Sequence, residues 1–468
     1  MRSILISTYE LGHQPFGLAS PVTWLLEEGF EVKTFDLALE TLDQDEITKA
    51  DFIGFYLPMH TATRLAVPAI SAVRRSNPTA HICAFGLYAP MNAKYLQKLG
   101  VNSVVGGEFE GEIVRIARRL AANGTSNRNE TRNEVVFLNK QSFKVPTRHD
   151  LPELERYAFL TMPNGNRRTV GYTEATRGCK HLCRHCPIVP VYNGRFMIVQ
   201  RDVVIKDIDQ QVQAGARHIT FGDPDFFNGV GHATKIVQAL HEHWPDLTYD
   251  VTIKIEHLVK HAEHLKTLRD TGCLFVTSAV ESVDDEILEK FDKGHTRKDF
   301  FRAVDLCRNV NLGLNPTFVA FTPWITLAGY RDLLSTIHQL DLVDAVAPVQ
   351  LAIRLLIPEG SLLLGLDDVG EFTAEFDEER LCYPWHHADT RVDQLQASIE
   401  GIVEDHCDSN ASRIEIFGHI WNETVRAIGD RDPMQIDLSS LSSRQQPYLS
   451  EAWYCCAEPT KQQMEIFI

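Results

Sequence analysis

Residues Glu174 to Cys186 read E-A-T-R-G-C-K-H-L-C-R-H-C and place Cys179, Cys183 and Cys186 in a C-x3-C-x2-C spacing. The stretch directly follows a β-like run at 169–173, so the cysteines are expected in a loop at the end of a strand. Three thiolates without a fourth cysteine nearby suit a cubane iron–sulfur cluster with one iron left open.

The spacing alone does not exclude a second kind of metal. Structural zinc usually takes four cysteine or histidine ligands, and His181 and His185 lie inside the same loop. The remaining interpretation involves no metal: the three cysteines are simply buried, or two of them form a disulfide and the third is a spare thiol. The spacing resembles the signature of the radical S-adenosylmethionine (SAM) enzymes. That resemblance implies a [4Fe-4S] cluster on the three cysteines whose open iron binds SAM.

The bulk composition bounds the class of protein. A chain of 468 residues suggests about three domains at ~150 residues each. The net charge of −17 argues against binding driven by nucleic-acid phosphates. No apolar run is long enough to span a membrane, and ten cysteines without a secretion signal indicate the cytoplasm.

The first region, residues 1–122, alternates short apolar runs with amphipathic stretches. This pattern predicts a Rossmann-like parallel sheet covered on both faces, which would bind a ligand at the carboxyl ends of its strands. The expected strands are Ser3–Ser7, Glu31–Phe35, Phe52–Tyr56, His81–Phe85 and Ser103–Val105.

The region resembles the cobalamin-binding domain that precedes the cysteine motif in many radical SAM enzymes. The run G-G-E-F-E-G-E at Gly106–Glu112 carries much of that similarity. The D-x-H-x-x-G motif, whose histidine ligates cobalt, is absent: the matching loop reads Y-E-L-G-H-Q-P-F-G, and His60 lies in a different loop. The domain is therefore expected either to hold cobalamin without a histidine ligand or to have lost it. His13 is a poor substitute.

A polar segment at 123–164 is expected to be a linker, with an added strand at Val135–Leu138. Residues 165–365 show a second alternation, which predicts a partial (β/α)6 TIM barrel with its site at the carboxyl ends of the strands. A small, mainly helical region at 366–468 is expected to follow. The predicted barrel strands are Val170–Thr176, His218–Phe221, Asp250–Ile255, Leu274–Val280, Leu314–Phe321 and Val349–Leu355.

Polar residues recur at the ends of these strands. The second strand leads into F-G-D-P-D-F-F-N, which resembles the glycine-acidic stretch that holds the SAM amino group. The candidates there are Gly222, Asp223 and Asp225, although an Asp- and Pro-rich turn is the structural alternative. The third strand is expected to turn Lys254 and Glu256 to one face, toward SAM or toward groups of adjacent strands.

The later strands extend this set. The fourth ends in Glu281 and Ser282 and is followed by a K-G-H-T segment, and both resemble segments of the family. The resemblance implies cofactor contacts for Glu281 and Ser282, whereas Lys293 and His295 would instead cap or support the barrel. The sixth would place Arg354 in the interior, where a guanidinium suits a carboxylate of SAM or of the substrate.

The segment L-S-E-A-W-Y-C-C-A-E-P places Cys455 and Cys456 side by side. A bridge between adjacent cysteines is strained, whereas two such thiols readily chelate a soft centre or undergo redox chemistry. Incidental cysteines in a tail are the plain alternative. The segment resembles the tail of the CUAEP/CCAEP-tail radical SAM proteins, in which the first cysteine position can be selenocysteine.

Together these features predict an enzyme that cleaves SAM reductively at a [4Fe-4S] cluster. The first hypothesis is transfer of a SAM-derived carbon group to a thiophilic acceptor, such as trivalent arsenic, held by Cys455 and Cys456 as catalytic residues. The second is a cobalamin-dependent radical methyltransferase. The third is a metal or metalloid sensor without catalysis. The expected partners are a small-molecule substrate and an electron donor such as flavodoxin or ferredoxin, with no nucleic acid or membrane.

Overall fold

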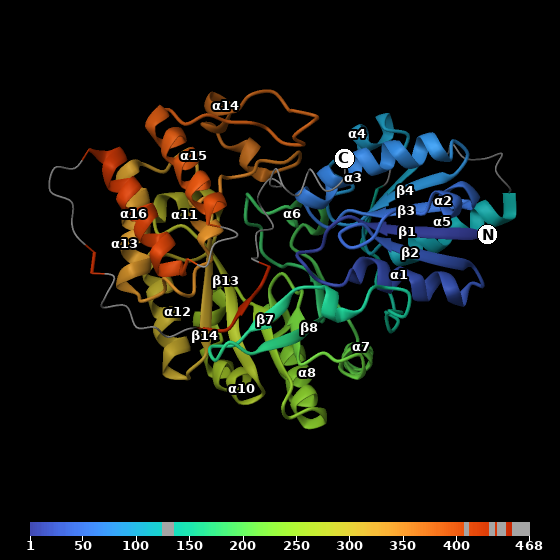
Figure 1. Cartoon of the computed structure of the whole chain (residues 1–468), viewed down its shortest axis with the longest axis horizontal. Helices are drawn as coiled ribbons and strands as arrows, with labels where there is room; N and C mark the ends of the chain where they lie inside the picture. Colours follow the sequence, from blue (N-terminus) through green and yellow to red (C-terminus); the bar gives the residue numbers. More distant parts are fainter. Residues whose placement is uncertain (124–134, 407–410, 430–435, 438–445, 452–468) are drawn as a thin grey trace.

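The computed structural model describes residues 1–123, 135–406, 411–429, 436–437 and 446–451. Figure 1 shows two sheets side by side, an N-terminal one in blue and a second one running from green to yellow. The orange helices α15 (Thr390–Asp405) and α16 (Arg413–Ile428) pack together beyond the second sheet, where α16 contacts α13 (Leu327–Gln339).

The N-terminal sheet has the strand order β2-β1-β3-β4-β5-β6, and all of its neighbouring strands are parallel. The predicted strands of this region are confirmed, including the added one near residue 136. Their bounds are β1 (Arg2–Ser7), β2 (Glu31–Asp36), β3 (Phe52–Tyr56), β4 (His81–Phe85), β5 (Ser103–Gly107) and β6 (Val136–Phe137).

Alternating side chains give this sheet a hydrophobic core on each face. Ile4 and Ile6 of β1 join one core and Leu5 joins the other, because successive side chains of a strand point to opposite faces. The first core is covered by α2 (Gln44–Lys49), α3 (His60–Ser76) and α4 (Ala93–Lys98). The second is covered by α1 (Phe16–Glu27) and α5 (Glu110–Asn123).

The second sheet has the order β14-β13-β12-β11-β8-β7-β15. Its first five strands are parallel and form the curled half-barrel, whereas β7 and the edge strand β15 are antiparallel additions at one side. The bounds are β7 (Phe159–Thr161), β8 (Arg167–Thr173), β11 (His218–Phe221), β12 (Thr248–Thr252), β13 (Cys273–Glu281), β14 (Gly313–Phe318) and β15 (Tyr448–Leu449). The predicted fold class, a Rossmann-like domain followed by a partial barrel, is confirmed.

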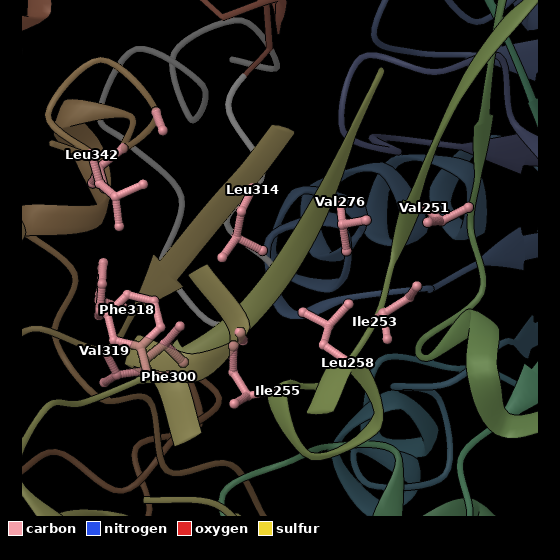
Figure 2. Close-up of a cluster of buried hydrophobic side chains, with 14 of the residues drawn as sticks. Val251, Ile253, Ile255, Leu258, Val276, Phe300, Leu314, Phe318, Val319 and Leu342 are labelled. Atoms are coloured by element: carbon pink, nitrogen blue, oxygen red, sulfur yellow. The ribbon is translucent and has the colours of Figure 1, made fainter. Parts of the chain in front are cut away.

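Helices cover the outer face of the half-barrel and build one large core with it. Figure 2 shows part of this core, in which Val251, Val276 and Leu314 lie on neighbouring strands and Leu258 and Phe300 on helices. The covering helices are α7 (Arg201–Gln213), α8 (Val230–His243), α9 (Ile255–Lys260), α10 (Leu265–Asp270), α11 (Asp285–Phe291), α12 (Arg297–Asn309) and α13. Two short helices, α6 (Val189–Tyr192) and α14 (Val369–Phe372), lie in connecting segments.

Two expected barrel strands were wrong in part. The third ends at Thr252, and Ile255 begins α9, whose buried Ile255 and Leu258 recur at helical spacing. The sixth, 349–355, is not a strand. Pro348 begins a short 3-10 helix, Pro348–Leu351, at a position that suits proline, and Arg354 makes only an isolated parallel bridge with Phe321.

The predicted domain boundaries at 122, 164 and 365 stay predictions. The stretch expected to be a linker supplies β6 to the first sheet and β7 to the second, and the C-terminal region supplies β15 to the second sheet. Across the described ranges, none of the helices combines the length and apolar character needed to cross a bilayer.

Candidate functional site

The cysteines lie after β8 and directly follow β9 (Thr176–Gly178), which forms a small antiparallel pair with β10 (Phe196–Ile198). Gly178 has φ 76°, and a Cβ there would lie 2.4 Å from Tyr192 Cδ1, so only glycine fits at the entry to the loop. Cys179 and Cys183 are buried free thiols, and Cys186 is half-buried. The predicted position of the three cysteines at a strand end is confirmed.

Asp223 fixes the start of the cysteine loop. Its carboxylate accepts hydrogen bonds from the Ala175 amide (2.9 Å) and from Thr176 Oγ1 (2.5 Å). Burial raises the pKa of Asp223 to about 7, against the opposing effect of the Thr176 bond. Because both oxygens have protein partners, the structure places Asp223 as support for the loop, whereas we had expected a SAM ligand.

Asp225 holds the middle of the same loop through two histidines. Its Oδ2 lies 2.6 Å from His257 Nδ1 and 3.5 Å from His181 Nε2. Burial alone would raise the pKa of Asp225, but the hydrogen bonds from the two histidines lower it below its ordinary value. The same aspartate caps a 3-10 turn by accepting from the Phe227 amide.

Glu281, at the end of β13, contacts the residue before the third cysteine. Its Oε1 lies 3.1 Å from His185 Nε2 and 3.3 Å from Lys293 Nζ, and all three side chains are buried. Burial would raise the pKa of Glu281, but Lys293 and His185 lower it to about 2. Glu281 has φ 69°, which is uncommon for a residue other than glycine and coincides with a bulge between β13 and β14.

Three further predicted residues also reach this region. Lys254 directly precedes α9, and its Nζ lies 3.6 Å from Cys183 Sγ. Glu256, in the first turn of α9, pairs with Lys254 and with His181 at 3.6 and 3.5 Å. Ser282 is buried and its hydroxyl accepts from the Asp284 amide.

Gly222 and Arg354 have different surroundings. A Cβ at Gly222 would lie 1.8 Å from the Tyr172 hydroxyl, so this glycine permits close packing against β8. The expected placement of Arg354 on an interior strand was wrong. Its guanidinium binds Asp393 (2.7 Å) and the Trp385 carbonyl, and it stacks 3.6 Å from the centroid of the Trp385 ring. An arginine held by a carboxylate and an indole in this way is not brought to the cysteines.

Sequence reasoning missed a buried ionic cluster that joins the two sheets. Arg177, two residues before Cys179, lies 2.7 Å from Glu110, 3.5 Å from Glu108 and 2.6 Å from Glu174. Burial raises the pKa of Glu108 to about 7 against the pull of Arg177, whereas Arg177 and several hydrogen bonds lower that of Glu110. The signal was present, because the G-G-E-F-E-G-E run and the arginine of the cysteine loop are both unusual among buried segments.

The N-terminal strand ends allow a test of whether a histidine-ligated cobalamin fits. His13 is only 7% exposed, and its ring centroid lies 4.9 Å from that of Tyr172. Burial lowers the pKa of His13 to about 4. His60 is fully buried, with its Nε2 2.7 Å from the Arg380 carbonyl oxygen. Both imidazole rings are buried in contacts with other protein groups, so neither fits the role of a cobalt ligand.

The described part of the C-terminal segment ends at the junction between the two sheets. β15 pairs with β7, Ser450 exchanges hydrogen bonds with Phe159, and Tyr9 donates a 2.5 Å hydrogen bond to Glu451. Gly12 packs against Glu451, since a Cβ at position 12 would lie 2.9 Å from Glu451 Cβ. The predicted catalytic residues Cys455 and Cys456 lie outside the described residues.

The cysteine loop fits an iron–sulfur cluster. Two buried thiols and a third half-buried cysteine lie together with the ammonium groups of Lys254 and Lys293, which offset the negative charge of thiolate ligands. Donor atoms of Cys179, His181 and Asp225 also lie within 4.8 Å of one another, as a metal site would require. Both Asp225 and His181 already contact polar groups of other side chains, which favours the three-thiolate set.

Comparisons with known proteins agree with this reading. Residues 173–322 match the model of the Radical SAM superfamily. The hopanoid C-3 methylase of Methylococcus capsulatus is 22% identical over 327 residues, which are 66% of this chain and 62% of that protein. The chain therefore spans less than two thirds of that relative.

Two solved structures share the fold. One is the cobalamin-dependent SAM radical enzyme OxsB with aqua-cobalamin and SAM bound, with a TM-score of 0.69 and 13% identity over 91% of this chain and 71% of that chain. The other is the radical SAM methyltransferase TsrM of Kitasatospora setae, with a TM-score of 0.60 and 18% identity over 73% and 71%. The cofactors of the family are a [4Fe-4S] cluster and SAM. Residues 173–322 are therefore a radical SAM domain, and the chain as a whole, its N-terminal cobalamin-binding-like domain included, shares the fold of these enzymes.

Proposed function

We propose that the protein is a radical SAM enzyme that transfers a SAM-derived carbon group to a soft, thiophilic acceptor. Cys179, Cys183 and Cys186 would hold a [4Fe-4S] cluster with one iron open to the amino and carboxyl groups of SAM. Such a cluster, when bound and reduced, supplies the electron that breaks a C–S bond of SAM. The buried thiols after β8 support this assignment.

The surrounding residues would set the shape of the cysteine loop. Asp223 bonds its first residues, Asp225 bonds His181 in its middle, and Glu281 bonds His185 near its end. Asp223 and Asp225 both follow β11 and Glu281 ends β13, so the loop is held at three points from two strand ends. These residues position the cysteines, and we do not count them as SAM ligands.

Contacts to SAM would come from groups that still face the site. Glu256 keeps 34% of its side chain exposed, and it carries a carboxylate suited to an ammonium or a ribose hydroxyl. The backbone of Gly222 and the hydroxyl of Ser282 complete the proposed set.

The position of Glu451 carries the proposal for the acceptor. This residue contacts Tyr9 at the end of β1, the loop that corresponds to the cobalt-ligating loop of cobalamin domains. Cys455 follows only four residues later, and four extended residues reach at most about 14 Å. The vicinal thiols Cys455 and Cys456 would therefore act near the junction of the two sheets, where they would chelate the acceptor or act as a redox pair.

The test is a C455S/C456S protein assayed anaerobically with SAM, reductant and trivalent arsenic as the acceptor. We expect SAM cleavage to continue while transfer to arsenic is lost, and the tail variant E458Q serves as a matched control. Transfer at the wild-type rate in C455S/C456S would contradict the proposal. Among the nucleoside products, methylthioadenosine indicates transfer of the aminocarboxypropyl group, and 5′-deoxyadenosine indicates ordinary homolysis.

A second candidate is a cobalamin-dependent radical methyltransferase, in which cobalamin binds without a histidine ligand. Two observations favour this candidate: the N-terminal sheet is parallel, and 91% of the chain shares its fold with OxsB. Reconstitution with cobalamin, followed by absorbance of the desalted protein, decides between the two. Retained corrinoid supports the second candidate, and its absence rules the candidate out.

A further inference from the structure

The ammonium group of Lys254 lies against the second cysteine of the loop. Its Nζ is 3.6 Å from Cys183 Sγ, within hydrogen-bonding range for the large sulfur atom. The sequence predicts that Lys254 projects from a strand, toward SAM or toward groups of adjacent strands. Because β12 ends at Thr252, the residue instead stands at the start of α9 and faces the thiol.

Lys254 has little contact with solvent. It is 7% exposed, and its nearest carboxylate is Glu256, 3.6 Å away and more exposed than the lysine. A buried ammonium group needs acceptors, because removing a charge from water is costly unless it is paired. Glu256 is an ion-pair partner at 3.6 Å, and among the described residues Cys183 Sγ is the acceptor within hydrogen-bonding range of Nζ.

The neighbouring lysine has a different arrangement. Lys293 is also buried and is influenced by the charges of Cys183 and Cys186, but it pairs with the Glu281 carboxylate at 3.3 Å. Glu281 is itself buried and shared with His185. The charge of Lys293 is therefore largely balanced by Glu281, whereas Lys254 directs a donor at a cysteine sulfur.

We propose that Lys254 donates a hydrogen bond to the Cys183 sulfur in the loaded protein and raises the reduction potential of the cluster. The inference rests on the proposed cluster site and adds a residue that tunes it. Hydrogen bonds to cysteine sulfur are among the factors that set the potential of iron–sulfur clusters. Reduction adds one negative charge to the cluster, so a buried cationic donor stabilises the reduced form more than the oxidised form.

The experiment is a potentiometric titration of the reconstituted full chain, monitored by electron paramagnetic resonance and performed without SAM. We expect K254Q to have a more negative midpoint than wild type, with the ratio of reduced to oxidised cluster at fixed potential falling about tenfold, equivalent to about 59 mV for a one-electron couple. K254R keeps a cationic donor, so its midpoint potential should lie between those of wild type and K254Q. K260Q, an exposed position at the end of the same helix, is the matched control and should not shift.

Iron and sulfide analysis accompanies each titration. An unchanged midpoint in loaded K254Q overturns the proposal. A shift seen only after SAM is added also overturns it, because that result assigns Lys254 to SAM. Loss of the cluster from both K254Q and K254R would assign the residue to assembly and overturn it as well. Failure of wild type to take up iron would instead defeat the proposed function, so the two failures are distinguishable.

Discussion

The Arg177 guanidinium lies 2.7 Å from the Glu110 carboxylate, and this buried contact joins the cysteine loop to the N-terminal sheet. Arg177 precedes Cys179 by two residues, and Glu110 begins α5 directly after the end of β5. The N-terminal domain is therefore tied to the loop that would carry the cluster. A change at this contact is expected to affect both stability and cofactor retention.

Removing Arg177 leaves Glu108, Glu110 and Glu174 buried without their shared cation. Breaking a buried ion pair on one side typically costs about 3–5 kcal/mol, because the partner charge stays uncompensated. We expect R177Q to lower the urea midpoint strongly. The R177Q/E110Q double variant should lose less free energy of unfolding than the sum of the losses in R177Q and E110Q. Strictly additive losses would show that the two side chains are not coupled.

The pH dependence of stability should follow Glu108. Burial raises its pKa from 4.5 to about 7, so the folded protein binds this proton more tightly than the unfolded chain. The stabilisation is fully present below pH 4.5 and is lost as the pH rises toward 7. The decline in the urea midpoint between pH 5 and pH 8 should be smaller in E108Q than in wild type. Equal declines in the two proteins would rule out Glu108 as the source.

Asp225 should govern how firmly the cysteine loop holds its cluster. D225N removes the carboxylate that binds His181 and His257, while the side chain keeps its size. Loss of such a supporting contact typically weakens metal affinity about 10- to 100-fold. Competition with an iron chelator measures the effect, and the exposed D246N is the control. Iron retention equal to wild type would show that the histidine contacts do not support the loop.

The Tyr9–Glu451 hydrogen bond should hold the C-terminal segment in place. Y9F removes a contact that contributes about 1 kcal/mol, which corresponds to roughly a fivefold change in the anchored population. We expect less transfer to the acceptor while SAM cleavage continues. E451Q weakens the same hydrogen bond by removing the charge of its acceptor, so it should also lower transfer while SAM cleavage continues. If both variants keep the wild-type ratio of transfer to cleavage, the anchor has no role in the reaction.

Much of the fold could be predicted because its signals are local. The strands Phe52–Tyr56 and His81–Phe85 were bounded correctly, since continuous apolar runs mark strands buried on both faces. The short antiparallel strands β7 and β15 were missed. They contain three and two residues, and their pairing joins segments almost three hundred residues apart, so no local pattern reveals it.

The candidate site shows the same division. The cysteine spacing and the acidic strand ends identified the right segments, because those residue types are unusual in such positions. The roles assigned to single residues changed, since they depend on which side chains meet across the fold. Asp223 binds the loop backbone, Lys254 faces a sulfur and Arg354 stacks on Trp385. None of these partners is near in sequence.

The central claim is that the three cysteines hold a cluster that cleaves SAM. The most direct measurement is anaerobic reconstitution of wild type and a C179A/C183A/C186A variant, followed by iron, sulfide and zinc analysis and assay of SAM cleavage with reductant. We predict about four iron and four sulfide per wild-type chain, with SAM cleavage on reduction, and neither in the triple variant. Stoichiometric zinc without sulfide, or a loaded cluster that leaves SAM intact, would contradict the account.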